Sequence, residues 1–393
     1  MKIMKFSITK DNLLKPLNIV SNFTADAIAV KKNQIFNNIL LDLTEDGLKV
    51  VATDGNTDIV TFVPKEKIET IEQTGKVTLS AKYLKSICTQ EYISKKTNAN
   101  DNLIEISFDE QIDQLIVKKG KGTFTFKTLN ADDFPKIPSF EPKISFKIKE
   151  GELKDIIKTT KFSMGSDDVR NIFNAMLFDV KNNFLNVVTT DSHRLSYNKY
   201  QLLDNDVAID DAMVIIAKKS IGEISALLQN TSKLVTINVA EKTFSLIHED
   251  FTYNSKIVEG TWPKYLGLFP NPNAYLGSFR IDKDILKSLI NNISFLCNAE
   301  STNWVTVVVE KGKIKIKNVT NSHECAEVTS NDVIYDGDYH EMTLNYKFLN
   351  DILNNVSSKE VIINIAKASI EIELSNDGSE CGELKFIIML VKL

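Results

Sequence analysis

The sequence predicts an α+β protein made of three similar domains, each about 130 residues long. Two kinds of amphipathic helix recur three times, alternating strands follow each second helix, and two proline-rich segments separate the repeats. A chain of 393 residues is too long for one ordinary core, so several domains are expected. We place them at residues 1–140, 141–272 and 273–393.

The first kind of helix is marked by apolar residues at helical spacing near the start of each third. Pro16 lies inside the first of these helices, where its ring should strain or kink the chain. Asp282 has a suitable side chain for an N-cap just before the third. The patterned residues are Leu13, Leu14, Leu17 and Val20, then Leu153, Ile156, Ile157 and Thr160, and finally Ile285, Leu286, Leu289, Ile290 and Ile293.

The second kind of helix follows a short strand and a turn, at 77–87, 214–224 and 342–352. These segments read VTLSAKYLKSI, VIIAKKSIGEI and MTLNYKFLNDI, and each has a lysine near the start of the expected helix, at Lys82, Lys218 and Lys347. A third landmark lies between the helices. LKVVATDGNTDIV and LNVVTTDSHRLSY align Asp54 with Asp191, and IKIKNVTNSHECAEV fills the equivalent place in the last third without the aspartate.

Alternating strands are predicted at 115–129, 243–258 and 369–390. The alternation of Phe124 and Phe126 with threonines is typical of a half-buried antiparallel strand. Segments 130–143 and 259–274 hold six of the eight prolines, so we interpret both as linkers between domains. Repetition alone does not distinguish this architecture from three tandem copies of any binding module.

Composition narrows the class of protein. Hydrophobic residues make up 43% and charged residues 25%, as in soluble globular proteins. No apolar run approaches the roughly 20 residues that cross a bilayer, and the start lacks a signal-peptide core, so we expect a cytoplasmic protein. Four cysteines lie far apart without a CxxC pair, which argues against a disulfide framework and a zinc site. They are Cys88, Cys297, Cys325 and Cys381.

The net charge of −5 counts against a conventional DNA binder, whose phosphate contacts usually require a basic domain.

Catalysis finds little support in the sequence. Asp191, Ser192 and His193 are consecutive and cannot form a triad, because neighbours in an extended strand point to opposite faces. The four histidines make no HxxxH or HExxH pattern, and no GxxxxGK[ST] loop is present. Asp54 and Asp191 are more typical of turn residues that bond their own backbone. We expect no active site, no cofactor and no metal.

Two alternatives remain: an enzyme whose site is assembled between domains, and a monomeric scaffold that binds protein alone.

The stretch from 159 to 200 closely resembles the middle domain of bacterial sliding clamps, the beta subunits of DNA polymerase III. Further matches keep order and spacing at 11–22 (DNLLKPLNIVSN), 129–138 (LNADDFPKIP) and 255–265 (SKIVEGTWPKY). The final FIIMLVKL resembles the family's hydrophobic, leucine-terminated tail. The resemblance covers essentially the whole chain. It implies the DNA-clamp fold, in which a head-to-tail homodimer closes into a ring with helices inside and antiparallel sheets outside.

The resemblance also implies a function. Such a ring is a non-catalytic accessory subunit of a DNA-directed DNA polymerase that encircles double-stranded DNA without reading its sequence. The acidic net charge is then no objection, since a ring linked topologically to DNA needs no tight phosphate contacts. Alternatively the lysines of the inner helices are merely solvated, because acidic residues lie among them. The DNA-facing candidates are Lys15, Lys82, Lys85, Lys154, Lys158, Lys161, Lys218, Lys219, Lys287 and Lys347.

The family's main working surface is a groove between the middle and last domains. It accepts short motifs from the replicative polymerase alpha subunit, the clamp loader, and translesion and repair proteins. Apolar members of the groove suit a leucine or phenylalanine anchor, whose full burial contributes about 1.5–3 kcal/mol. The alternative for FIIML is a plain core strand. The residues carried over are Arg170, Phe173, Thr190, His193, Arg194, Leu195, Pro263, Leu268, Asn345, Phe348, Ser369, Ile387, Met389, Leu390 and Val391.

Four departures from the family pattern affect the shape of this pocket. Ser192 stands where glycine is usual, and Phe173 where leucine is common. Gly267 occupies a position that relatives often fill with a large basic residue, and the tail reads Met-Leu-Val-Lys-Leu instead of Met-Pro-Met-Arg-Leu.

Subunit contacts are also implied. Phe124 and Phe126 should face Phe295 and Leu296 of the partner subunit, which would cover an apolar edge strand. Lys121 could pair with Glu324 or Glu327 across the same boundary. The alternative for the two phenylalanines of the first domain is a core role.

Overall fold

The computed structural model describes residues 3–23, 34–90, 102–109, 111, 113–137, 140–166, 171–202, 211–299, 303–319, 325–375 and 381–392. By packing, the chain forms two compact units. The first comprises Met1–Ser145 and Val235–Lys256, and the second comprises Phe146–Leu234 and Ile257–Leu393. The expected boundaries of three domains divide the chain differently from these units and stay a prediction.

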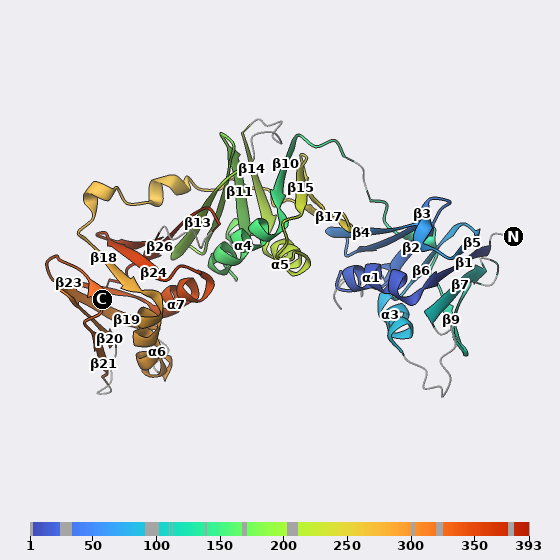
Figure 1. Cartoon of the computed structure of the whole chain (residues 1–393). Coiled ribbons are helices and arrows are strands. Elements are labelled where there is room, and N and C mark those ends of the chain that lie inside the picture. The colour runs from blue at the N-terminus through green and yellow to red at the C-terminus, as the bar shows by residue number, and fades with distance from the viewer. Residues whose placement is uncertain are drawn as a thin grey trace. The chain divides into compact units, whose positions relative to one another are not determined.

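The helices occur in pairs, as the repeats predict. In the first unit α1 (Lys10–Val20) packs against α3 (Ala81–Thr89). In the second unit α4 (Glu150–Thr160) packs against α5 (Lys218–Leu227), and α6 (Lys283–Ala299) against α7 (Tyr346–Asn355). Figure 1 shows the first helix of each pair beside the second. The threefold helix repeat is therefore confirmed.

Local sequence explains where these helices begin. The Thr9 hydroxyl accepts a hydrogen bond from the Asn12 amide at the start of α1. The Asp282 carboxylate accepts from the amides of Asp284 and Ile285 at 2.8 and 3.2 Å, so the predicted N-cap is confirmed. Pro16 does not interrupt α1, whose assigned helix continues to Val20.

Strands of the first unit form two antiparallel sheets. One has the order β5-β1-β7-β8-β9, which leaves β9 at an edge, and the other contains the run β15-β16-β17-β4-β3-β2-β6. The bounds are β1 (Ile3–Thr9), β2 (Ile39–Leu43), β3 (Gly47–Thr53), β4 (Thr57–Pro64), β5 (Thr70–Gln73), β6 (Gly75–Leu79), β7 (Leu103–Asp109), β8 (Gln114–Lys119), β9 (Gly122–Lys127), β15 (Leu234–Val239), β16 (Thr243–Ile247) and β17 (Phe251–Lys256).

The second unit also contains two sheets, with the orders β14-β11-β12-β13-β26-β25-β24-β18-β22 and β21-β20-β19-β23. A further strand, β10 (Ile144–Lys149), leads into α4. The other bounds are β11 (Ala175–Lys181), β12 (Phe184–Thr190), β13 (Arg194–Gln201), β14 (Ala212–Ala217), β18 (Gly277–Asp282), β19 (Trp304–Glu310), β20 (Lys313–Asn318), β21 (Glu327–Ser330), β22 (Val333–Ile334), β23 (His340–Asn345), β24 (Glu360–Ile365), β25 (Ser369–Leu374) and β26 (Glu383–Met389).

Two strand pairs join neighbouring thirds of the sequence. Strand β4 of the first third pairs with β17, which follows it by almost 200 residues, with Thr61 opposite Phe251. Strand β13 of the middle third pairs with β26 at the end of the chain, with Leu195 opposite Ile387. The thirds therefore share continuous sheets at both places.

The two aligned aspartates sit in equivalent turns. Asp54 accepts from the amides of Asn56 and Thr57, and Asp191 accepts from those of His193 and Arg194. Their predicted role as turn residues is confirmed. The next residue has a positive φ in both turns, 87° at Gly55 and 77° at Ser192, which is the conformation that favours glycine.

Among the described residues, no helix has both the length and the apolar character needed to cross a membrane.

Candidate functional site

The centre of the candidate site is the pairing of β13 with β26. Leu195 lies directly opposite Ile387, and Arg194 opposite Ile388. Directly opposed residues in an antiparallel pair point to the same face, so Leu195 and Ile387 share one face of the sheet. Both are buried and belong to a single apolar cluster. The structure therefore brings together two of the predicted groove residues from distant parts of the chain.

Aromatic residues of the segment after β17 complete this cluster. Trp262 and Tyr265 are buried in it, and Phe269 packs against it. The ring of Phe173, a predicted groove residue, meets Trp262 edge-on with 6.1 Å between ring centroids. Trp262, Tyr265 and Phe269 were not among the predicted residues. The signal that could have found them is the run of aromatic residues in TWPKYLGLF, which is unusual for a proline-rich linker.

Exposed apolar groups border the buried cluster. Pro263 is exposed, Leu268 exposes 55% of its surface and Met389 exposes 44%. Met389 lies opposite Ser369 at the end of β26, and its amide donates to the carbonyl of His193 at 2.9 Å. The buried floor thus continues into an accessible apolar rim.

The tail beyond β26 runs along the last domain. The Leu390 amide donates to the carbonyl of Ala368 at 2.9 Å, and the Val391 amide to that of Thr343 at 2.8 Å. Leu390 packs against the domain's core, as does Phe348. Asn345 caps α7, because its side chain accepts from the Lys347 amide at 3.0 Å. These predicted groove residues therefore lie around the start of α7, next to the tail.

Arg194 is the most heavily bonded of the predicted groove residues. Its guanidinium donates to Asp191 at 3.0 Å, to Asp351 at 2.5 Å and to the carbonyl of Phe162 at 2.7 Å. It also lies over the ring of Phe348, 4.5 Å from the centroid, and its side chain is only 11% exposed. Arg194 thus links β13 to α7. Its side chain lies on the face of β13 opposite to that of Leu195.

Two other polar residues of the groove differ in exposure. The Thr190 hydroxyl is part-buried and donates to the Arg194 carbonyl at 2.6 Å, within the turn, whereas the His193 side chain is exposed. Arg170 lies outside the described residues.

A charged cluster lies beside the apolar face. Lys385 is within 4 Å of the carboxylates of Glu371, Glu373 and Glu383. Burial disfavours the charged form of Lys385, but hydrogen bonding and attraction to these carboxylates outweigh burial and raise its pKa. Burial raises the pKa of Glu371, whose carboxylate also accepts a hydrogen bond from Tyr275.

The candidate DNA-facing lysines are spread over all the paired helices. Lys82, Lys158 and Lys347 are exposed, and Lys154 and Lys287 are partly exposed. Others already have partners within their own unit. Lys15 pairs with Asp250 at 2.5 Å, Lys85 donates to Ser21, Lys161 to Ser225 and Lys218 to the carbonyl of Gly165, and Lys219 lies 3.8 Å from Glu223.

The residues predicted to join subunits lie at accessible places. Phe124 and Phe126 are partly buried on edge strand β9, and the Phe126 ring stacks on the exposed ring of Tyr83 with 5.9 Å between centroids. Phe295 on α6 exposes 64% of its surface, and Leu296 beside it is partly exposed.

The charged residues expected at this subunit boundary have different surroundings. Lys121 is exposed, whereas Glu327 on β21 already pairs with Lys315 at 2.9 Å. Glu324 lies outside the described residues.

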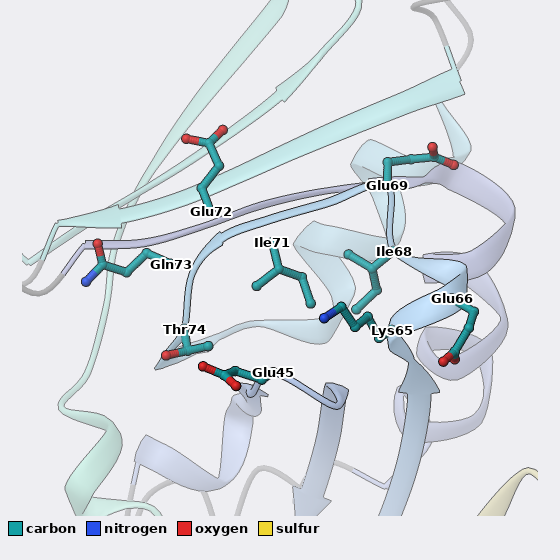
Figure 2. Close-up of a pocket in the computed structure, with 9 residues that line it drawn as sticks. All are labelled: Glu45, Lys65, Glu66, Ile68, Glu69, Ile71, Glu72, Gln73 and Thr74. Atoms are coloured by element: carbon teal, nitrogen blue, oxygen red, sulfur yellow. The ribbon is translucent and has the colours of Figure 1, made fainter.

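A pocket in the first unit has no catalytic arrangement. Glu45, Glu66, Glu69 and Glu72 line it with Lys65, Ile68, Ile71, Gln73 and Thr74. Figure 2 shows the four carboxylates pointing in different directions, and Glu72 is paired with Lys5 at 2.7 Å. Over the described part of the chain, His, Cys, Asp and Glu form no group of three or more that could hold a metal ion.

Comparisons with known proteins agree across the whole chain. Models of the N-terminal, central and C-terminal domains of the DNA polymerase III beta subunit match residues 4–138, 147–264 and 268–389. The beta sliding clamp of Pseudomonas aeruginosa is 30% identical over 99% of this chain and 100% of its own, and that of Buchnera aphidicola is 29% identical with the same coverage. A crystal structure of the Pseudomonas aeruginosa clamp bound to griselimycin superposes with a TM-score of 0.86, at 26% identity and with 99% and 100% of the two chains covered.

The helix pairs recur three times and pack on shared antiparallel sheets, and an apolar cluster lies where the middle and last repeats meet. This arrangement defines a three-domain clamp protein. The chain belongs to the DNA polymerase III beta subunit family, the beta sliding clamps. Its function is that of a sliding clamp, a non-catalytic processivity subunit of the polymerase holoenzyme.

Proposed function

We propose that two copies of this chain associate head to tail into a ring that encircles duplex DNA without sequence preference. Family membership supports this proposal, and so do the lysines on the paired helices. The net charge of −5 fits a ring that holds DNA by topology, since tight phosphate contacts would impede sliding. Acting on chromosomal DNA would place the protein in the cytoplasm.

We further propose that the face around Leu195 and Ile387 is a cleft for short peptide motifs. The observation that carries this is a buried apolar floor, built by β13 and β26, that opens at Met389 and Leu268. Burying one leucine or phenylalanine side chain of a partner against this floor would contribute about 1.5–3 kcal/mol to the free energy of binding. Methionine at the rim adapts to different partners because its side chain is flexible and polarizable. The crystallised relative that binds griselimycin agrees with a ligand site on this fold.

The partners of this cleft would be the replicative polymerase alpha subunit, the clamp loader, and translesion and repair proteins. A polymerase held by a weak peptide contact would stay near the primer end at high effective concentration. Processivity would then rise without tight binding to DNA. With one cleft in each chain, a dimer would hold two partners.

A DNA-retention assay tests the ring. The protein is loaded by a clamp loader onto nicked circular DNA, which is then linearised by a restriction enzyme. Loss from the linear form with retention on the intact circle is expected. Equal retention on both forms would show ordinary contact binding and contradict the ring.

A double substitution tests the cleft. Met389→Glu with Leu390→Glu should abolish binding of a labelled peptide with a Leu-Phe anchor, because charges would replace the apolar rim and its neighbour. The dimer, measured by sedimentation, should persist. Undiminished peptide binding would show that the cleft lies elsewhere.

A further inference from the structure

The segment that leads from the middle to the last domain is tied down near both ends. This segment, Trp262–Tyr275, is called the bridge here. The Tyr265 hydroxyl donates to the Asp179 carboxylate on β11 at 2.6 Å. The Tyr275 hydroxyl donates to the Glu371 carboxylate on β25 at 2.9 Å. One bridge thus has two tyrosine–carboxylate bonds, to strands on either side of the β13–β26 pair.

The Tyr265–Asp179 bond is buried, and the Tyr275–Glu371 bond is partly buried. Tyr265, Asp179 and Glu371 expose 4%, 6% and 1% of their surfaces. Removing the Tyr265 hydroxyl would leave the buried Asp179 carboxylate without this donor, at a cost in desolvation. Removing the Tyr275 hydroxyl would leave Glu371 with Lys385, 3.6 Å away. Burial, reinforced by the carboxylate in each pair, raises the pKa of both tyrosines, that of Tyr275 to about 12. Both hydroxyls therefore remain donors at neutral pH.

The two anchors hold the bridge beside the proposed cleft. The rings of Tyr265 and Phe269 pack on Tyr197, with centroids 5.9 and 5.4 Å away. Glu371 lies directly opposite Ile387, so the second anchor is one strand away from the cleft floor. Between the anchors the short helical turn η7 (Tyr265–Leu268) exposes Leu266 and Leu268.

We infer that Tyr265 and Tyr275 are positioning residues that fix the bridge as one wall of the cleft. This inference rests on the proposed peptide cleft. An anchored wall would meet the peptide already ordered, so binding would not have to restrict the bridge. Without an anchor the exposed leucines would sample other positions, and the peptide would lose affinity although none of its own contacts had been removed.

The test uses Tyr→Phe substitutions in the full-length dimer. The probe is a fluorescein-labelled pentapeptide with a Leu-Phe anchor, followed by fluorescence anisotropy. Tyr265→Phe and Tyr275→Phe should each weaken binding about three- to tenfold, a fraction of what a hydrogen bond to a charged group can contribute. The matched control is Tyr200→Phe, because Tyr200 also donates to a carboxylate, that of Glu152, but the bond joins β13 to α4. The control should bind within about twofold of wild type.

Replacing the acceptor separates positioning from general destabilisation. Asp179→Asn keeps an oxygen that Tyr265 can donate to and should bind the peptide nearly as wild type, whereas Asp179→Ala should behave like Tyr265→Phe. Affinities of the bridge variants equal to that of Tyr200→Phe would overturn the inference. So would a loss in Asp179→Asn as large as that in Asp179→Ala. If wild type itself fails to bind the probe, the cleft proposal falls, and the inference with it. If wild type binds, Met389→Glu abolishes binding and both tyrosine variants bind as tightly as Tyr200→Phe, the cleft stands without the anchored wall.

Discussion

Arg194 shows how one side chain can hold two repeats together. It bonds the carboxylates of Asp191 and Asp351 and a backbone carbonyl, and it stacks on Phe348. The planar guanidinium of arginine can donate in several directions at once. The single ammonium group of lysine cannot make the same set of bonds.

We therefore expect Arg194→Lys to destabilise the protein by about 1.5–3 kcal/mol, the range for hydrogen bonds to charged groups. Urea denaturation followed by circular dichroism measures this. Arg280→Lys is the matched control, since Arg280 is half-exposed and 3.8 Å from Glu360, and its effect should stay within about 0.5 kcal/mol. Similar losses in the two variants would contradict the role given to Arg194.

Two glycines should respond in opposite ways to the same added methyl group. At Gly55, φ is 87° and a Cβ would lie 3.2 Å from the ring of Phe36. Gly55→Ala should cost about 1–2 kcal/mol, because an L side chain is unfavourable in the left-handed region. Gly222 lies in α5 with nothing within 4 Å of such an atom. Gly222→Ala should add about 0.5–1 kcal/mol, since glycine weakens a helix interior. Thermal unfolding would compare them, and a stabilised Gly55→Ala variant would refute the argument.

At the scale of the element, strand β26 serves two faces. Phe386 and Ile388 are buried in the core of the last domain, whereas Ile387 joins the cluster on the opposite face and Met389 is the exposed rim. The core-strand reading of FIIML holds for Phe386 and Ile388, and the groove reading of Ile387 and Met389 stays a prediction that the same element can accommodate. Alternation along a strand permits this because successive side chains point to opposite faces.

Substitutions on the two faces of β26 should therefore have different effects. Phe386→Ala removes a fully buried ring and should cost about 3–5 kcal/mol of stability. Met389→Ala removes a half-exposed side chain and should cost less than about 1 kcal/mol, yet weaken peptide binding. Denaturation and anisotropy on both variants give the comparison. A large stability loss in Met389→Ala would mean that Met389 is structural.

The sequence predicted this site in part. Leu195, Ile387 and Met389 came from the family resemblance, and the fold places them together. Trp262, Tyr265 and Phe269 were missed, because their segment reads as a linker and nothing local shows that its aromatic residues fold back onto the sheet. The bonds of Tyr265 and Tyr275 reach carboxylates about 90 residues away, and such pairings have no periodicity from which to be predicted.

At the scale of the whole molecule, the repeat predicted the helices well because amphipathic spacing is a local signal. The pairings β4–β17 and β13–β26 could not be predicted in the same way. They join strands from different repeats, and the sequence of an edge strand does not indicate which strand will pair with it. Consequently the two compact units of the chain cut across the repeats.

The proposed ring, with its acidic net charge, should respond to salt differently from a protein held by phosphate contacts. A protein held by six to ten phosphate contacts loses about 10³–10⁵ in affinity between 50 and 200 mM salt. A clamp loaded on circular DNA should instead stay bound across this range, because release needs ring opening. Gel filtration of loaded circles at increasing salt measures retention, with linear DNA as the control. Release from circles as steep as that of a contact binder would contradict topological linkage.

The place of β26 in its sheet also has a consequence for how the protein is made. Strand β26 is the last of the described strands in chain order and lies between β13 and β25, so this sheet stays open at that place until β26 has been synthesised. Until then one edge each of β13 and β25 would lack its partner strand, and unpaired edges promote aggregation. A chain that ends early would lack both the closing strand and the floor of the cleft. Synthesis of β26 therefore completes this sheet and the proposed docking site in one step, and a chain truncated before β26 would be a substrate for chaperones and proteases instead of a defective competitor on DNA.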